Sequence, residues 1–152
     1  MNTHNEILNA AISYVQNGLH IFPLMPCDKR PLTKNGFKDA SDNIEDIYKW
    51  WGQYPDANIG LPTGELNNLV VVDIDGVYPP EWPPLQPTHV VKTAKGHHYY
   101  YAYPEGFDIR SRTKIDGYDI DVRANGGYVV APPSYHPNGG RYEFIALSLI
   151  HI

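Results

Sequence analysis

The sequence contains only one cysteine, Cys27, among its 152 residues. A single cysteine cannot form an internal disulfide or, by itself, a Cys-based zinc site, so we expect a reducing, cytoplasmic setting. No apolar run approaches the roughly 20 residues that span a bilayer. The first residues also lack the basic start and long apolar run of a signal peptide. These absences argue against a disulfide-stapled secreted domain and against a membrane protein.

Positive charge is also scarce, because 12 Lys and Arg residues stand against 17 Asp and Glu residues, for a formal net charge of −5. Domains that coat nucleic acid through bulk electrostatics are usually basic, so this balance disfavours that class. Half of the 12 basic residues nevertheless lie between Lys92 and Arg123, which leaves room for a local basic patch. The sequence has no Gly-x-x-x-x-Gly-Lys-Ser/Thr loop, and therefore no P-loop ATPase motif.

The composition indicates one globular domain rather than a disordered chain, since 42% of residues are hydrophobic and 19% are charged. Fourteen prolines and 13 glycines predict many turns and short elements. The 12 tyrosines suit half-buried strands and a polar cleft, because tyrosine combines an apolar ring with a polar tip.

Apolar spacing predicts two helices followed by strands. The first helix carries Ile7 to Val15 and ends at Gly18, and the second starts at a capping signal of Asp42 with Glu45. Runs of β-branched and aromatic residues predict strands over 19–24, 58–61, 69–72, 90–91, 98–103, 120–122, 128–131 and 142–144. We expect Gly126-Gly127 to join two of these strands as a hairpin. The predicted class is α+β with a mainly antiparallel sheet.

The first candidate site is Asp73-Ile74-Asp75, directly after the most hydrophobic strand. Side chains alternate along a strand, so both aspartates point to one face and could hold one or two divalent metal ions. Oxygen ligands suit Mg²⁺ or Mn²⁺. Without a cation or basic partner, the two carboxylates would repel each other. The alternative is a polar strand end that caps the Asp75-Gly76 turn.

The second candidate is the turn from Thr93 to His98, where Gly96 permits close backbone approach. His98 and the nearby Lys95 could contact a triphosphate. Because His97 and His98 are adjacent on a strand, at most one of them faces the site. The alternative is a pair of solvent-facing histidines in a loop.

The third candidate is Asp119-Ile120-Asp121-Val122-Arg123, in which alternation places Asp119, Asp121 and Arg123 on one face. Arg123 could neutralise phosphate or orient Asp121. The alternative is a structural ion pair on a sheet.

These motifs, in this order, resemble the archaeo-eukaryotic primase superfamily, and specifically the bifunctional DNA primase/polymerase N-terminal domain of plasmid and phage replication proteins. That family's pattern is Asp-x-Asp/Glu, Ser-x-His and a later hydrophobic-Asp motif. The resemblance extends from about Ala10 to Phe144 through further segments: Phe22-Pro23-Leu24, Lys29-Arg30-Pro31, Gly36 to Ala40, Trp50-Trp51, Asn58-Ile59-Gly60, Thr63-Gly64 and Gly126 to Ser134. It implies an RRM-like catalytic core.

The resemblance also implies a DNA-directed nucleotidyltransferase in which two Mg²⁺ or Mn²⁺ ions are held by Asp73, Asp75 and Asp121. His98 would contact the nucleotide phosphates, and further nucleotide-binding candidates are Gly96, Arg123, Lys95 and Lys29. The expected partners are nucleoside triphosphates and a single-stranded DNA template with its primer, with a helicase domain downstream in a full-length protein. Gly96 departs from the family pattern, because it replaces the serine of the second motif.

Several alternatives stay open at this level. Lys29 could lie in a solvated loop, and His136 could approach the nucleotide or, as we favour, cap a turn. The Trp50-Trp51 pair could stack on bases, although such a pair more often contributes to a core. The whole domain could be a non-catalytic replication or DNA-binding module that retains the fold. A sugar-nucleotide transferase would use the first motif but would explain neither His98 nor the Asp121 strand.

The last six residues, 147–152, form a separate question. Written as the codons CTG TCT CTT ATA CAC ATC, they resemble the end of a common transposon-based sequencing adapter. One hypothesis is that they are an adapter scar on a C-terminally truncated catalytic domain over 1–146. The other is an ordinary apolar terminal segment.

Overall fold

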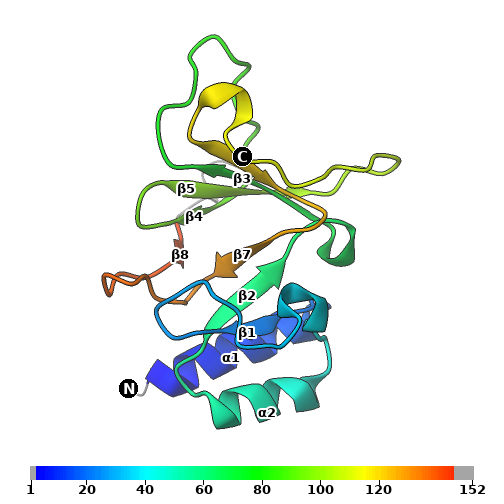
Figure 1. Cartoon of the computed structure of the whole chain (residues 1–152), viewed down its shortest axis with the longest axis vertical. Coiled ribbons are helices and arrows are strands. Elements are labelled where there is room, and N and C mark those ends of the chain that lie inside the picture. The colour runs from blue at the N-terminus through cyan, green and yellow to red at the C-terminus, as the bar shows by residue number, and fades with distance from the viewer. Residues whose placement is uncertain (1–2, 146–152) are drawn as a thin grey trace.

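The computed structural model describes residues 3–145, with the side chains of residues 6–145. The segment 147–152, interpreted above as an adapter scar, lies outside the described residues. Two α-helices, α1 (Thr3–Gln16) and α2 (Ile44–Gln53), lie side by side at one end of the molecule (Figure 1). No helix in the described segment is long and apolar enough to cross a membrane.

Both helices bury one apolar face, as their spacing predicts. In α1 the buried residues Ile7, Ala11 and Val15 recur every four positions, which places them on one stripe of the helix. In α2 the cap is Asn43, whose side chain accepts a hydrogen bond from the Glu45 backbone N–H. The Asp42 cap prediction is therefore wrong by one residue.

The helices cover one face of a three-stranded antiparallel sheet (Figure 1). Its strand order is β1 (Phe22–Leu24), β2 (Asn58–Pro62), β7 (Tyr128–Ala131). The main hydrophobic core joins the two helices to β2 and β7, and it includes Trp51, Ile59 and Val129. Trp51 is 3% exposed and its indole N–H donates to the Ala57 carbonyl, so this tryptophan belongs to the core.

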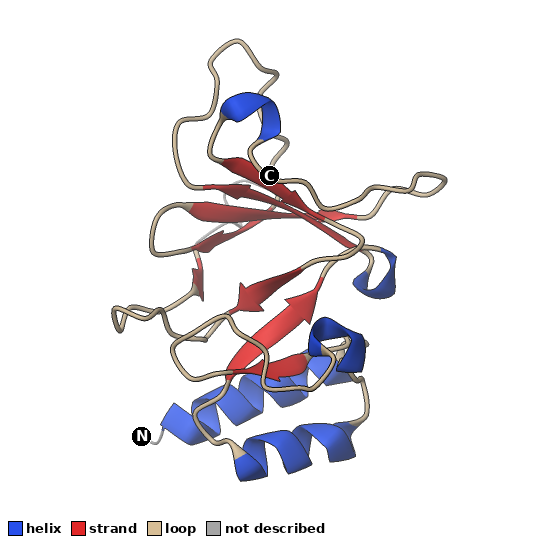
Figure 2. Cartoon of the chain, in the orientation of Figure 1, coloured by secondary structure: helices blue, strands red, loops and turns tan. Residues whose placement is uncertain are grey.

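A second antiparallel sheet has five strands and lies on the side away from the helices (Figure 2). Its strand order is β6 (Ile120–Arg123), β3 (Leu69–Ile74), β5 (His97–Ala102), β4 (His89–Lys92), β8 (Glu143–Phe144). The β-branched run forms β3, which pairs on both edges and extends to Ile74. Asp73 therefore lies inside the strand rather than directly after it.

The predicted Gly126-Gly127 hairpin is wrong, because β6 and β7 belong to different sheets. The segment between them instead carries the chain from one sheet to the other. Thr63 at the end of β2 fixes this crossing: its hydroxyl donates to the Ala124 carbonyl and its backbone N–H donates to Gly127. The predicted α+β class with antiparallel pairing is confirmed, and the crossing places residues of both sheets around a common cavity.

Candidate active site

Three of the predicted site residues form a row across the five-stranded sheet. Asp73 on β3 is directly opposite Asp121 on β6 and directly opposite His98 on β5. Directly opposed residues of antiparallel strands point to the same face, so the three side chains are neighbours. Asp73 is 8% exposed and His98 is 7% exposed, so both polar groups are largely removed from water.

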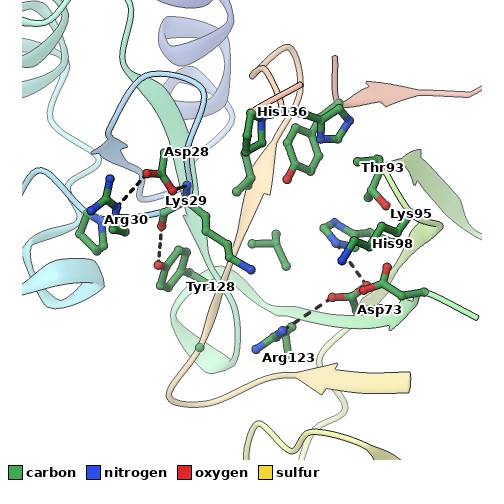
Figure 3. Close-up of a pocket in the computed structure, with 18 of the residues that line it drawn as sticks. Asp28, Lys29, Arg30, Asp73, Thr93, Lys95, His98, Arg123, Tyr128 and His136 are labelled. Carbon is green, nitrogen blue, oxygen red and sulfur yellow. Dashed lines mark hydrogen bonds and ion pairs between the residues drawn. The ribbon is translucent and has the colours of Figure 1, made fainter. Parts of the chain in front are cut away.

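A cavity of about 700 Å³ opens beside this row and is lined by both sheets. Figure 3 shows Asp73 and His98 on one side of it and the loop with Asp28, Lys29 and Arg30 on the other. The cavity brings together five of the predicted site residues with Asp73: Asp75, His98, Lys95, Arg123 and Lys29. The sequence places these residues up to 94 positions apart, so the fold alone assembles them.

Asp73 lies between two basic side chains. His98 Nε2 is 3.6 Å from its Oδ1, and an Arg123 guanidinium nitrogen is 3.7 Å from its Oδ2. Both are ion-pair distances, and Oδ1 is buried without a hydrogen-bond partner. Burial raises the pKa of Asp73, but the His98 contact and the Arg123 charge outweigh burial and lower the pKa below its ordinary value. Asp73 is therefore held as a carboxylate.

Asp75 shows the opposite behaviour. Partial burial and then the negative charge of Asp73 raise the pKa of Asp75 above its ordinary value. These two carboxylates, one on β3 and one in the bend directly after it, thus repel each other, as their spacing predicts. The cavity offers a place where a cation would relieve that repulsion.

Asp121 is held differently from the other two aspartates. Its Oδ2 accepts a 2.8 Å hydrogen bond from Arg123, and its Oδ1 accepts a 2.9 Å hydrogen bond from the Lys114 backbone N–H. Asp121 is not among the residues that line the cavity. In the part of the chain that the structure describes, no three His, Cys, Asp or Glu side chains are grouped closely enough to hold a metal ion.

Gly96 lies in the turn between β4 and β5, packed against the end of β3. A Cβ on this residue would overlap the Ile74 carbonyl oxygen and approach Asp75 Cα to 3.0 Å. Gly96 also exchanges hydrogen bonds with Thr93, whose hydroxyl accepts its N–H at 3.0 Å. The residue that replaces the family's serine therefore allows close backbone packing behind the aspartates, and it does not itself line the cavity.

The loop opposite the aspartates is fixed to the three-stranded sheet. Tyr128 on β7 donates its hydroxyl to the Lys29 carbonyl at 2.6 Å, and Asp28 accepts hydrogen bonds from the Lys29 backbone and the Arg30 side chain. In Figure 3 the Lys29 side chain extends into the cavity. Lys29 is exposed and also lines the cavity, so both the phosphate-contact prediction and the solvated-loop alternative stay open.

His136 and Tyr142 also line the cavity, and their ring centroids are 4.0 Å apart. Burial, followed by the negative charges of Asp73 and Asp75, raises the pKa of the Tyr142 hydroxyl. Sequence reasoning missed Tyr142 and favoured a turn role for His136. No spacing signal connects Tyr142 to Asp73, because long-range contacts bring it to the site: its backbone N–H donates to the Ser134 carbonyl, and β8, which follows it, pairs with β4.

The α+β fold thus surrounds one cavity with carboxylates and basic side chains. A comparison with protein families identifies the family of this chain. Residues 11–149 match the family of bifunctional DNA primase/polymerase N-terminal domains, and the chain belongs to that family. The resemblance predicted from Ala10 to Phe144 is thus confirmed, and it carries a primase/polymerase role at the level of the family. A comparison with curated proteins finds no match.

Proposed function

We propose that this domain catalyses template-directed, metal-dependent nucleotidyl transfer, as a DNA primase/polymerase. The observation that carries the proposal is the cavity itself, in which Asp73, Asp75 and His98 face Lys29 across one space. Nucleotidyl transfer needs positioned reactants and neutralised phosphate charge more than covalent help from the protein. A cavity with carboxylates and cations on its walls suits that requirement.

Asp73 and Asp75 would bind Mg²⁺ or Mn²⁺, and Asp121 would complete the ligand set for two ions. The buried Oδ1 of Asp73, which has no hydrogen-bond partner, and the mutual repulsion of Asp73 and Asp75 fit a divalent cation. Bound ions of this kind lower the pKa of a primer 3′-hydroxyl and neutralise charge as pyrophosphate leaves. The protein's own part is to hold these carboxylates at two paired strands, with Asp73 on β3, Asp75 directly after it and Asp121 on β6.

The triphosphate would bind across the cavity. His98, Lys95 and Arg123 come from the five-stranded sheet and Lys29 comes from the opposite loop, so phosphate oxygens would meet positive groups from two sides. Gly96 contributes by letting its turn pack behind Asp75. The volume of about 700 Å³ falls in the range of small-molecule and cofactor sites.

The remaining parts of the proposal concern partners. A single-stranded DNA template and primer would run past the open side of the cavity, with modest and salt-dependent affinity because the chain has a net charge of −5. We further propose a cytoplasmic role in plasmid or phage replication, with a helicase portion downstream in the full-length protein. These statements rest on the family and not on a feature of the cavity.

Primer extension tests the proposal. The wild-type chain is incubated with a primed single-stranded template, deoxy- or ribonucleoside triphosphates, and Mn²⁺ or Mg²⁺, beside Asp73→Ala and the exposed control Glu105→Ala. We expect metal-dependent extension by the wild type and the control, and none by Asp73→Ala. Extension that survives in Asp73→Ala would overturn the assignment.

One observation favours a second candidate, a non-catalytic DNA-binding module. Asp121 is occupied by Arg123, and no three-ligand metal group is assembled among the described residues. If a folded wild-type chain binds single-stranded DNA but extends no primer with either metal, this second function replaces the first.

A further inference from the structure

The guanidinium of Arg123 bridges two carboxylates that the proposed function assigns to metal binding. It lies 2.8 Å from Asp121 Oδ2 and 3.7 Å from Asp73 Oδ2. The two aspartates are directly opposite each other on β3 and β6, so one cation between them meets both. Arg123 is therefore placed where a shared divalent ion would be needed.

Asp121 has a second contact besides Arg123. Its other oxygen, Oδ1, accepts a 2.9 Å hydrogen bond from the Lys114 backbone N–H. Lys114 has a left-handed backbone conformation, with φ of 48°, which turns that N–H toward the carboxylate. Removal of the guanidinium would leave Oδ2 unpaired while the carboxylate stays anchored.

Asp73 also has carboxylate oxygens that a metal ion could contact. Its Oδ1 is buried without a hydrogen-bond partner, and its Oδ2 faces Arg123. A guanidinium and a divalent ion cannot both occupy the space between the two Oδ2 atoms, because they would overlap and their positive charges would repel. The guanidinium also cannot lose its charge, since arginine stays protonated in proteins. It can only move away.

We propose that Arg123 is a placeholder cation: it neutralises Asp73 and Asp121 in the metal-free protein, and a divalent ion displaces it into the cavity. This inference rests on the proposed function and adds a coupling to it. Arg123 already lines the cavity, so a displaced guanidinium would meet the phosphates of a bound nucleotide. Metal binding would thereby prepare the site for the triphosphate.

Two consequences follow from thermodynamic linkage. In the wild type the ion must displace the Arg123 guanidinium. Removing that guanidinium by mutation should therefore raise the affinity of the site for metal. Without the Arg123 guanidinium, the two close carboxylates lack their shared cation, so the metal-free protein should be less stable. Added metal should restore that stability.

The test is Mn²⁺ binding to the whole chain by calorimetry, without nucleotide, for the wild type, Arg123→Met and Lys95→Met. Lys95 lines the same cavity but forms no ion pair with Asp73 or Asp121 within the described residues. We expect Arg123→Met to bind Mn²⁺ roughly tenfold more tightly and Lys95→Met to gain less than about threefold. The thermal midpoint of Arg123→Met should be lower without metal and should rise more on adding Mn²⁺.

Equal affinity in Arg123→Met and the wild type, or an equal gain in Lys95→Met, would overturn the placeholder. If Arg123→Met does not fold, NMR of the wild type replaces this test, with the Arg123 Nε–Hε resonance assigned by comparison with Arg123→Lys. Displacement requires that Mg²⁺ shift this resonance. A resonance that does not move at saturating Mg²⁺ would refute displacement. The wild type could show metal-dependent extension while Arg123→Met binds Mn²⁺ no more tightly. That result would refute the placeholder proposal and leave the proposed function intact. Absence of Mn²⁺ binding in both proteins would remove the metal-dependent function as well.

Discussion

Asp73 on β3 lies directly opposite His98 on β5, and the His98 Nε2 is 3.6 Å from the Asp73 Oδ1. This pair joins the first and second sequence motifs in one buried contact. His97, the neighbour of His98, points to the opposite face of the sheet because side chains alternate along β5. The two adjacent histidines therefore offer a matched comparison.

His98→Ala should remove a partner of the buried Asp73 carboxylate and leave it poorly compensated. We expect a loss of about 1–3 kcal/mol in the free energy of unfolding, measured by urea denaturation with tryptophan fluorescence, together with loss of primer extension. His97→Ala should change stability by less than about 0.5 kcal/mol. Equal effects of the two substitutions would contradict the importance of the Asp73–His98 contact.

Asp75→Asn should stabilise the protein near neutral pH. The folded-state pKa of Asp75 is raised by burial and by Asp73, so its ionised form disfavours folding above that pKa. We expect the thermal midpoint to rise by about 2 °C at pH 7, while extension is lost. The gain should fade as the pH falls below the ordinary aspartate pKa, since both states are then protonated.

The matched control is Asp119→Asn on β6's N-terminal side. Its pKa is lowered by the hydrogen bond and charge of Lys114, which is the opposite direction. This substitution should therefore not raise the thermal midpoint at pH 7. A rise of the same size in both variants would show that general charge reduction, rather than Asp73–Asp75 repulsion, is responsible.

Gly96→Ser would restore the family's serine but should destabilise this chain. Its Cβ would overlap the Ile74 carbonyl, which requires a shift of the turn or of β3. We expect a cost of about 1–3 kcal/mol in the free energy of unfolding, and reduced extension, because Asp73 lies on β3 and Asp75 directly follows it. Gly52→Ser, at an uncrowded helical position, should have a much smaller effect. Faster extension by an equally stable Gly96→Ser would show that the turn adapts and that the hydroxyl matters.

Lys29→Met should raise the KM for nucleoside triphosphates roughly tenfold, because one charged phosphate contact would be lost. Its stability should stay close to that of the wild type, since the Tyr128 hydrogen bond uses the Lys29 backbone carbonyl. Lys34→Met, which lines a separate groove, is the control for overall charge. If steady-state kinetics give the same KM for both variants, Lys29 does not contact the nucleotide and the solvated-loop interpretation holds.

The local features of this protein can be predicted from its amino-acid pattern alone. Period-two alternation placed Asp73 and Asp75 on one face, helical spacing identified the buried stripe of Ile7, Ala11 and Val15, and the ordered motifs identified the family. Such features depend on neighbours within a few residues, or on a pattern along the whole chain, so they can be read without coordinates.

Features that depend on contacts between distant segments are visible only in the folded structure. That structure assigned β6 and β7 to different sheets, which no local turn signal at Gly126-Gly127 could show. It placed Arg123 of β6 beside Asp73 of β3, and it brought Tyr142 to the cavity through contacts of the segment just before β8. Strand register and sheet membership follow from long-range packing, because a turn sequence fixes only its own backbone and not the partner that the next strand will find.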